Sequence, residues 1–172
     1  MQHELIDVLI VEDENELAQL HAELIGKHPR LRLVGIAASL ADAQVQLESK
    51  QPKLMLLDNY LPDGKGITLI SNPMLTRANC SVIFITAASD MDTCSQAIRN
   101  GAFDYILKPV SWKRLSQSLE RFCAVCRTAA RLEDCRPAER GFTLSVTGEK
   151  LSSGQRQQRD RGEHAGAGAN AV

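Results

Sequence analysis

Short apolar runs alternate with amphipathic stretches over residues 7–126, and this alternation limits the chain to few folds. The five runs occupy residues 8–11, 33–36, 54–57, 82–85 and 105–107. The runs show no regular alternation with polar residues, so most of the strands they form should be covered on both faces. Buried strands that alternate with amphipathic helices are typical of a parallel sheet between two layers of helices.

Leucines and hydroxyl residues between these runs predict the first helices. Leu17, Leu20 and Leu24 recur at helical spacing and predict the apolar face of the first helix. Ser39 and Ser89 each precede a carboxylate by three residues, a pattern typical of a helix N-cap. These serines therefore predict where the second and the fourth helix begin.

Proline and glycine mark where the later helices break or end. Pro73 should kink or shorten the third helix, expected over roughly residues 67–77. Asn100 and Gly101 should end the fourth helix, and Ser111 should cap the fifth. The apolar face of the fifth helix consists of Leu115, Leu119, Phe122 and Cys126. Five strands and five helices in strict alternation predict a doubly wound α/β domain over residues 5–127.

Composition excludes several classes of protein. The chain of 172 residues carries 20 lysines and arginines against 21 aspartates and glutamates, which excludes a uniformly basic coat for nucleic acid. No apolar run approaches the roughly 20 residues that span a bilayer, and no basic and apolar leader begins the sequence. The five cysteines are an odd number, which argues against a disulfide framework. We therefore expect a cytoplasmic protein with no membrane contact.

The sequence changes character after residue 127. Between residues 152 and 172 the only apolar side chains are alanines and one terminal valine. Such a segment cannot bury enough surface to offset the entropy lost on ordering. We expect a linker over residues 128–151 and a disordered tail over residues 152–172.

Polar residues follow four of the five apolar runs. The first run is followed by Glu12 and Asp13, the third by Asp58, the fourth by Thr86 and the fifth by Lys108. In an open parallel sheet, ligands bind outside the carboxyl ends of the strands. Three carboxylates, one hydroxyl and one ammonium should therefore meet at one edge of the sheet.

These residue types suit phosphoryl chemistry at a metal centre. Clustered carboxylates repel one another unless a cation joins them, and oxygen ligands favour Mg²⁺ or Mn²⁺. Asp58, at the tip of the middle strand, can attack a phosphoryl donor and form an aspartyl phosphate. Lys108 can pair with one phosphoryl oxygen, and the Thr86 hydroxyl can donate a hydrogen bond to another. The pattern predicts a site that holds phosphate.

Five motifs occur in a fixed order along residues 5–127. They are VLIVEDE at 8–14, LLD at 56–58, LPDG at 61–64, TAA at 86–88, and FDY at 103–105 with a Lys-Pro pair at 108–109. Together they resemble the receiver domain of bacterial two-component response regulators. Residues 57–66 and 86–91 are also similar to the citrate and C4-dicarboxylate-responsive group of these regulators. The resemblance implies a flavodoxin-like five-stranded sheet with strand order 2-1-3-4-5.

The resemblance implies a role for each acidic residue of the expected site. Asp58 matches the phospho-acceptor, which receives its phosphoryl group from a sensor histidine kinase. Glu12 and Asp13 match the acidic pair that holds Mg²⁺ together with Asp58. Tyr60 matches the position whose backbone carbonyl completes the metal shell.

The other matched residues belong to the switch that the resemblance implies. Thr86 matches the hydroxyl that moves toward the phosphoryl group, and Tyr105 the aromatic residue that turns inward with it. Lys108 matches the phosphoryl-binding lysine, which precedes a cis proline, here Pro109. Phosphate would then bias the surface made by the fourth helix, the fifth strand and the fifth helix. The same surface is the expected site of a homodimer.

The segment after the expected receiver domain shows no pattern of a DNA-binding domain. The regulators of this group resemble two-domain proteins, in which a C-terminal helix-turn-helix binds DNA and regulates transcription. Residues 128–172 lack two consecutive amphipathic helices joined by a short turn. We therefore expect DNA binding only if the intact protein carries a further domain. The Arg/Gly/Ala-rich ending also resembles GC-rich coding DNA read out of frame, and our hypothesis is loss of that domain by frameshift or truncation.

The leading interpretation is a phospho-acceptor that is not an enzyme and assists only its own phosphorylation and dephosphorylation. Three alternatives to it stay open. A stand-alone receiver would act through protein contacts or as a phosphate sink. A phosphatase of the haloacid-dehalogenase type would place a second acid two residues after the first, where this chain has Tyr60. A flavodoxin-like nucleotide binder would need a phosphate loop after the first strand, where Glu12, Asp13 and Glu14 repel phosphate.

Overall fold

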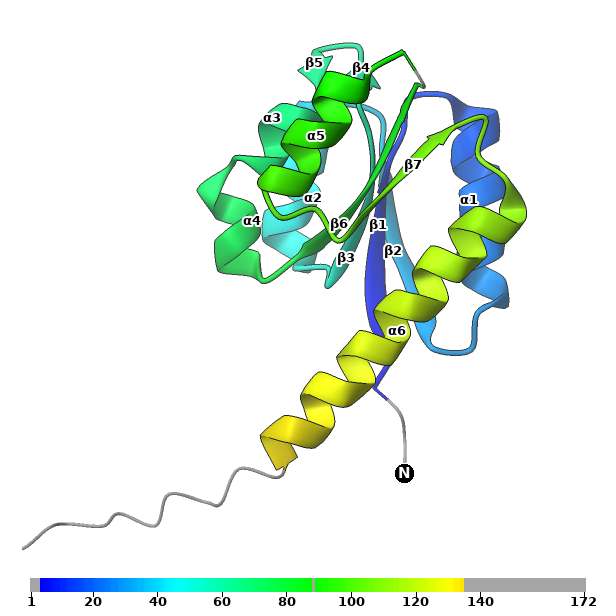
Figure 1. Ribbon diagram of the computed structural model, residues 1–172, viewed down its shortest axis with the longest axis vertical. Helices are drawn as coiled ribbons and strands as arrows, with labels where there is room; N and C mark the ends of the chain where they lie inside the picture. Colours follow the sequence, from blue (N-terminus) through cyan, green and yellow to red (C-terminus); the bar gives the residue numbers. More distant parts are fainter. Residues whose placement is uncertain (1–3, 88, 135–172) are drawn as a thin grey trace, which may run out of the picture. The chain divides into compact units, whose positions relative to one another are not determined.

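The computed structural model describes residues 4–87 and 89–134 (Figure 1). Its main strands are β1 (Ile6–Val11), β2 (Leu31–Ala37), β3 (Leu54–Asp58), β6 (Ser81–Ala87) and β7 (Asp104–Lys108). They form one parallel sheet in the order β2-β1-β3-β6-β7. A short antiparallel hairpin, β4 (Tyr60–Leu61) and β5 (Gly64–Lys65), stands apart from this sheet. Without the hairpin, the order is the expected 2-1-3-4-5, which confirms the predicted fold class.

Two layers of helices cover the sheet (Figure 1). The helices are α1 (Asn15–Lys27), α2 (Leu40–Lys50), α3 (Ile67–Ile70), α4 (Pro73–Ala78), α5 (Met91–Arg99) and α6 (Trp112–Asp134). Side chains from α1 and α6 fill the core on one face of the sheet. Side chains from α2 to α5 fill the core on the other face. The sheet is therefore buried on both sides, as its unbroken apolar runs predict.

The central strands divide their side chains between the two cores. In β1, Val8 and Ile10 belong to the core under α1 and α6, whereas Leu9 and Val11 belong to the opposite core. All five residues of β3 are buried, and its last residue is Asp58. Each buried aliphatic side chain contributes about 1.5–3 kcal/mol. The apolar burial of β3 therefore holds the Asp58 backbone in one place at the edge of the sheet.

The third expected helix is divided in two at Pro73. Helix α3 ends at Ile70, and Pro73 begins α4, where its missing N–H removes no helical hydrogen bond. Asn72 caps α4 by accepting a hydrogen bond from the Met74 N–H at 2.9 Å. The described part of the chain thus has six helices rather than five, and the expected effect of Pro73 is confirmed.

Two of the three expected serine caps are confirmed. Ser39 accepts from the Asp42 N–H and Ser111 from the Arg114 N–H, both at 3.1 Å. The prediction for Ser89 is wrong, because α5 begins at Met91 and its N-cap is Asp90. The Asp90 N–H donates to the Ala87 carbonyl at 3.1 Å, which closes a turn that contains Ser89 and starts the helix one residue later.

The buried face of α1 differs from the expected leucine stripe. Leu20 is 53% exposed, and the buried positions of α1 are Ala18, His21, Leu24 and Ile25. Leucines lie on more than one face of this helix, and packing against the sheet selects the face that carries Ala18 and Ile25. As a result, a histidine enters the core.

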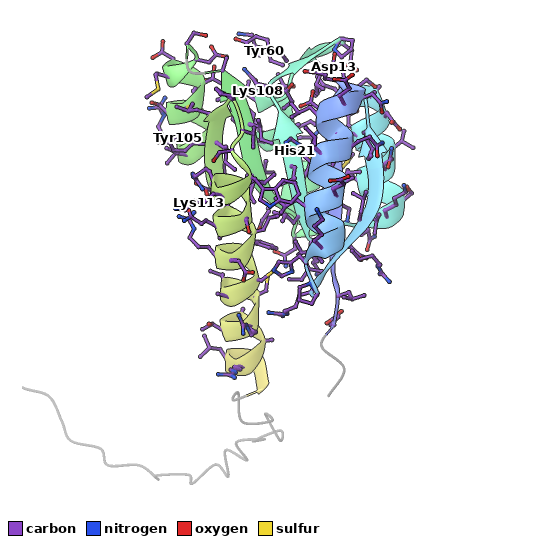
Figure 2. All side chains as sticks on the ribbon, turned by 90° about the vertical axis from the view of Figure 1, so that its right-hand side faces the viewer. Asp13, His21, Tyr60, Tyr105, Lys108 and Lys113 are labelled. Carbon is purple, nitrogen blue, oxygen red and sulfur yellow. The ribbon has the colours of Figure 1, made fainter. Side chains whose placement is uncertain are left out.

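His21 is 3% exposed, and neither ring nitrogen has a hydrogen-bond partner among the described residues. The pKa of His21 is lowered from 6.5 to about 4, chiefly because a charged ring would lose its hydration on burial. The positive charge of Lys108 contributes to this shift, and Asp58 opposes it. The imidazole is therefore neutral at physiological pH, and Figure 2 places it between α1 and the sheet, below Lys108.

The last helix continues beyond the expected end of the domain. Helix α6 runs to Asp134, so residues 128–134 of the expected linker are helical. The rest of that linker, to residue 151, and the expected disordered tail over 152–172 lie outside the described residues. Among the helices that the structure describes, none combines the length and the apolarity needed to cross a bilayer.

We expect the His21→Leu variant to resist acid unfolding better than the unchanged protein. The unfolded chain takes up a proton near pH 6.5, whereas folded His21 does so only near pH 4. The stability that depends on neutral His21 is complete above pH 6.5 and is lost as the pH falls toward 4. The free energy of unfolding in urea should therefore favour the variant increasingly as the pH falls from 6.5 to 4, by on the order of 3 kcal/mol in total.

Leu24→Ala is the matched control for this measurement, because Leu24 shares the buried face of α1 but does not titrate. It should lower stability by about 2–5 kcal/mol without changing the pH dependence. Parallel stability curves for His21→Leu and the unchanged protein would contradict the assignment of a depressed histidine pKa.

Candidate functional site

Three carboxylates meet at the carboxyl edge of the sheet, as the sequence predicts. Glu12 and Asp13 directly follow β1, and Asp58 ends β3. One oxygen from each of the three lies within 4.8 Å of the others. Glu12 and Asp58 are each 3% exposed, whereas Asp13 is exposed to solvent. The arrangement is an acidic pocket that is open on the side of Asp13.

Lys108, at the end of β7, supplies the positive charge of the site. Its Nζ lies 2.9 Å from Asp58 Oδ2 and 3.5 Å from Glu12 Oε2. Burial lowers the pKa of Lys108, but the hydrogen bond to Asp58 and the negative charges of Asp58 and Glu12 outweigh it and raise the pKa above its usual value. The peptide bond between Lys108 and Pro109 is cis, as expected.

Glu12 is the least compensated group of the pocket. Its pKa is raised from 4.5 to about 7, chiefly by burial and in part by repulsion from Asp58 and Asp13. The Glu14 N–H, which donates to Glu12 Oε1 at 3.1 Å, and the charge of Lys108 act in the opposite direction. Glu12 Oε2 is buried and accepts no hydrogen bond from the described residues, and the Lys108 ammonium 3.5 Å away is an ion-pair partner only. A buried carboxylate oxygen without a donor is a position that a cation would satisfy.

The loop after Asp58 is shaped by backbone contacts. Tyr60 N–H donates to Asp58 Oδ1 at 3.3 Å, and Gly66 N–H donates to the Asn59 carbonyl at 2.8 Å. A Cβ on Gly66 would lie 2.1 Å from the Asp58 carbonyl oxygen, so only glycine permits this close approach. The loop therefore wraps back tightly against the end of β3.

The far end of this loop is attached to α2. Asp63, in the turn between β4 and β5, accepts hydrogen bonds from the N–H groups of Leu40 at 2.8 Å and Ala41 at 2.9 Å. These bonds lower the pKa of Asp63, because they favour its ionised form. Asp63 thus caps a helix that precedes it by more than twenty residues in the chain, a contact that the sequence did not reveal.

The two expected switch residues lie on neighbouring strands. Thr86, near the end of β6, is fully buried, and its hydroxyl has no hydrogen-bond partner among the described residues. Tyr105 is half-buried in β7 and packs against the core under α2 to α5. Figure 2 shows Asp13, Tyr60 and Lys108 at one end of the domain and Tyr105 farther along it. The structure thus brings the acidic residues and Lys108 together and leaves Tyr105 outside the pocket.

Two contacts beside the site had no signal in the sequence. The Asn59 Nδ2 and the Tyr60 hydroxyl both donate to Asp90 Oδ2, at 2.9 Å and 2.5 Å. Asp90 lies 31 positions after Asn59, so no local pattern connects them. Asp90, which the sequence analysis did not single out, is therefore an additional residue of the site region.

Comparison with known proteins identifies this arrangement. The sequence profile described as the response regulator receiver domain matches residues 8–120. The chain belongs to this family. Receiver domains bind Mg²⁺ at an acidic pocket, and Glu12, Asp13 and Asp58 form such a pocket in this receiver domain.

Relatives agree with the expected group of regulators. The transcriptional regulatory protein DpiA of Escherichia coli (strain K12) is 48% identical over 117 residues, which cover 68% of this chain and 52% of DpiA. The transcriptional regulatory protein CitB of Klebsiella pneumoniae is 50% identical over 117 residues, covering 68% of this chain and 50% of CitB. The receiver chain thus spans about half the length of these relatives.

Solved structures share the fold. The response regulatory domain of protein mrkE from Klebsiella pneumoniae is 28% identical with a TM-score of 0.64, covering 72% of this chain and 99% of that one. A DNA-binding response regulator of the LuxR family from Staphylococcus aureus is 25% identical with a TM-score of 0.62, covering 68% of this chain and 98% of that one. The receiver fold predicted from the motifs is confirmed.

We expect Glu12→Gln to stabilise the metal-free receiver at high pH. Glu12 is protonated in the folded state up to about pH 7 but ionises near 4.5 when unfolded. The stability that depends on its protonated form is complete below pH 4.5 and is lost as the pH rises through 7. Urea unfolding in the presence of a chelator should therefore show no gain for the variant at low pH and a gain of about 1–3 kcal/mol above pH 7.

Glu14→Gln, which removes an exposed carboxylate two residues away, is the matched control. A gain for Glu12→Gln that is equal at all pH values would mean that Glu12 is not held protonated by burial.

Proposed function

We propose that this receiver domain accepts a phosphoryl group on Asp58 from a phosphohistidine of a sensor histidine kinase. The observation that carries the proposal is the surroundings of Asp58. Its carboxylate is buried at the end of the central strand, 2.9 Å from an ammonium and beside two further carboxylates. An Asp58 oxygen attacks the phosphorus, the P–N bond breaks, and its electron pair stays on the imidazole. The product is an aspartyl phosphate on this chain.

The donor set fits a divalent cation with a preference for oxygen. Glu12, Asp13 and Asp58 would hold Mg²⁺ or Mn²⁺ together with the Tyr60 backbone carbonyl. The buried Glu12 Oε2, which accepts no hydrogen bond from the described residues, supports this assignment. When bound, the ion neutralises negative charge on the carboxylates and on the incoming phosphoryl oxygens.

Lys108 and Thr86 can receive the phosphoryl group. The Lys108 ammonium is already held at the acceptor carboxylate, so it can pair with a phosphoryl oxygen after a small movement. The Thr86 hydroxyl has no competing partner among the described residues, so it is free to donate a hydrogen bond to another oxygen. Movement of Thr86 toward the phosphate would vacate space beside Tyr105, which is the proposed coupling to the output face.

The proposed output face consists of α5, β7 and α6. Its elements carry the exposed apolar residues Met91, Ile98 and Leu107, whereas the ring of Trp112 lies beside α1, with Lys27 Nζ 4.9 Å from its centroid. Exposed apolar side chains on one face are typical of a protein contact, and a homodimer through this face is the proposed result of phosphorylation. The relatives DpiA and CitB are named as transcriptional regulatory proteins, so we propose that the switch serves transcription wherever a DNA-binding domain accompanies the receiver. The proposed compartment is the cytoplasm, where a kinase domain would meet it.

The phosphatase alternative is disfavoured at one position. A haloacid-dehalogenase-type enzyme needs an acid two residues after its nucleophile, and Tyr60 stands there with its hydroxyl bonded to Asp90. We therefore propose a phospho-acceptor that promotes its own phosphorylation and hydrolysis and has no separate substrate.

We expect acetyl phosphate and Mg²⁺ to label the receiver, and Asp58→Asn to abolish labelling, because the amide is not a nucleophile. The measurement is intact-mass spectrometry, which detects the added phosphoryl group. Asp92→Asn removes an exposed carboxylate from the first turn of α5 and should label like the unchanged chain. Equal labelling of Asp58→Asn would show that the acceptor is a different residue.

We also expect Mg²⁺ to stabilise the receiver against urea, because it binds only where the fold assembles the carboxylates. At ten times its dissociation constant the gain should be about 1.4 kcal/mol. Asp13→Asn should reduce the gain at the same concentration, whereas Glu14→Gln should not. No response of the unchanged chain to Mg²⁺ would speak against the metal site.

A further inference from the structure

Asp90 occupies the N-cap of α5 but does not cap it. An aspartate at this position ordinarily accepts a hydrogen bond from an N–H in the first turn of its helix. In this structure no side-chain capping bond is present at Asp90. Its Oδ2 instead accepts from Asn59 Nδ2 at 2.9 Å and from the Tyr60 hydroxyl at 2.5 Å. We call this group of three residues the Asp90 clasp.

Asn59 is the buried half of the clasp. It is fully buried, and its backbone N–H donates to the Ile85 carbonyl at 3.0 Å. Its carbonyl accepts from Gly66 N–H at 2.8 Å, and its Oδ1 accepts from Ile67 N–H at 3.3 Å. Asn59, directly after β3, therefore contacts three other elements. It is bonded to β6 through Ile85, to the start of α5 through Asp90, and to the start of α3 through Ile67. A residue held on all sides in this way transmits a displacement rather than absorbing it.

Tyr60 is the exposed half of the clasp. Its side chain is 48% exposed, and the ring carries the Lys65 ammonium at 5.8 Å from its centroid. The hydrogen bond to Asp90 raises the pKa of the Tyr60 phenol and lowers the pKa of Asp90, and Lys65 lowers the pKa of Asp90 as well. At neutral pH a protonated phenol thus donates to an ionised carboxylate, which is a strong form of hydrogen bond.

The clasp reaches the reacting group through the backbone. The Tyr60 N–H donates to Asp58 Oδ1 at 3.3 Å, slightly beyond the usual 2.7–3.2 Å for this kind of bond. The orientation of the acceptor carboxylate therefore depends on where the Tyr60 backbone lies. The Tyr60 carbonyl is also the proposed backbone ligand of the metal. Figure 2 shows Tyr60 at the same end of the domain as Asp13 and Lys108.

We propose that Asp90 is a positioning residue for phosphoryl transfer. Through Asn59 and Tyr60 it holds in place the backbone that orients the Asp58 carboxylate. The same contacts connect this backbone to the first turn of α5. The inference rests on the proposed phosphorylation of Asp58. Asp90 touches neither the phosphoryl group nor the metal, so it acts only through its two partners.

The test is a double-mutant cycle of Asp90→Ala and Tyr60→Phe, with acetyl phosphate and Mg²⁺ as the probe. Each single variant should slow phosphorylation about tenfold, because a small displacement of a reacting group is costly in rate. The double variant should be hardly slower than either single one, because the second change has no bond left to remove. Asp90→Asn, which keeps an acceptor oxygen, should recover part of the rate.

Asp92→Ala removes an exposed carboxylate from the first turn of the same helix, so it is the matched control and should leave the phosphorylation rate unchanged. Tyr60→Phe removes a single hydroxyl, so it carries the kinetic test even if Asp90→Ala folds poorly.

The outcomes separate this inference from the proposed function. If the unchanged chain takes no phosphate, the proposed function falls and this inference falls with it. If the unchanged chain is labelled but the two single effects multiply in the double variant, Asp58 remains the acceptor and the clasp has no positioning role. An Asp90→Asn variant as slow as Asp90→Ala would likewise overturn the clasp.

Discussion

Parallel strand pairing brings the carboxyl ends of β1, β3, β6 and β7 to one edge, and the chemistry of this receiver depends on that constraint. The three central strands, β1, β3 and β6, are buried on both faces, so a slip of one residue would move their side chains into the wrong core. The pairing of Ile10 with Leu56 and of Leu56 with Ile83 therefore determines the register of the whole edge. Glu12 and Asp58 are held together because the apolar residues behind them have no alternative packing.

The result is an electrostatic conflict that the fold only partly relieves. One ammonium, from Lys108, faces two buried carboxylates and a third that is exposed. Burial and repulsion together raise the pKa of Glu12 to about 7, which is a cost in stability at neutral pH. Functional sites commonly retain such costs, because the arrangement that destabilises the empty site favours its ligand. A cation is the ligand that this distribution of charge favours, and the proposed phosphoryl transfer depends on it.

The loop after Asp58 connects the acidic edge to two helices on the same face of the sheet. Asp63 caps α2 from the β4–β5 turn, and Asp90 binds Asn59 and Tyr60 from the start of α5. Both aspartates bind chain segments that are distant in sequence. Asp63 accepts from backbone N–H groups at the start of α2, and Asp90 accepts from side-chain donors of the loop after Asp58. The hydrogen bonds of Asp90 thus connect the segment after Asp58 to α5, a helix of the proposed output face.

The sequence alone determined the five strands, their burial, the break at Pro73 and the convergence of Asp58 with Lys108, because apolar periodicity and strand-end position are local properties of a chain. Tertiary structure decided what depends on partners distant in sequence. Packing against the sheet turned His21 rather than Leu20 inward, and the Asp90 carboxylate, instead of capping the backbone of its own helix, binds Asn59 and Tyr60. A side chain with several competing neighbours is placed by the relative energies of those contacts, and these exist only after the sheet and both helical layers have come together.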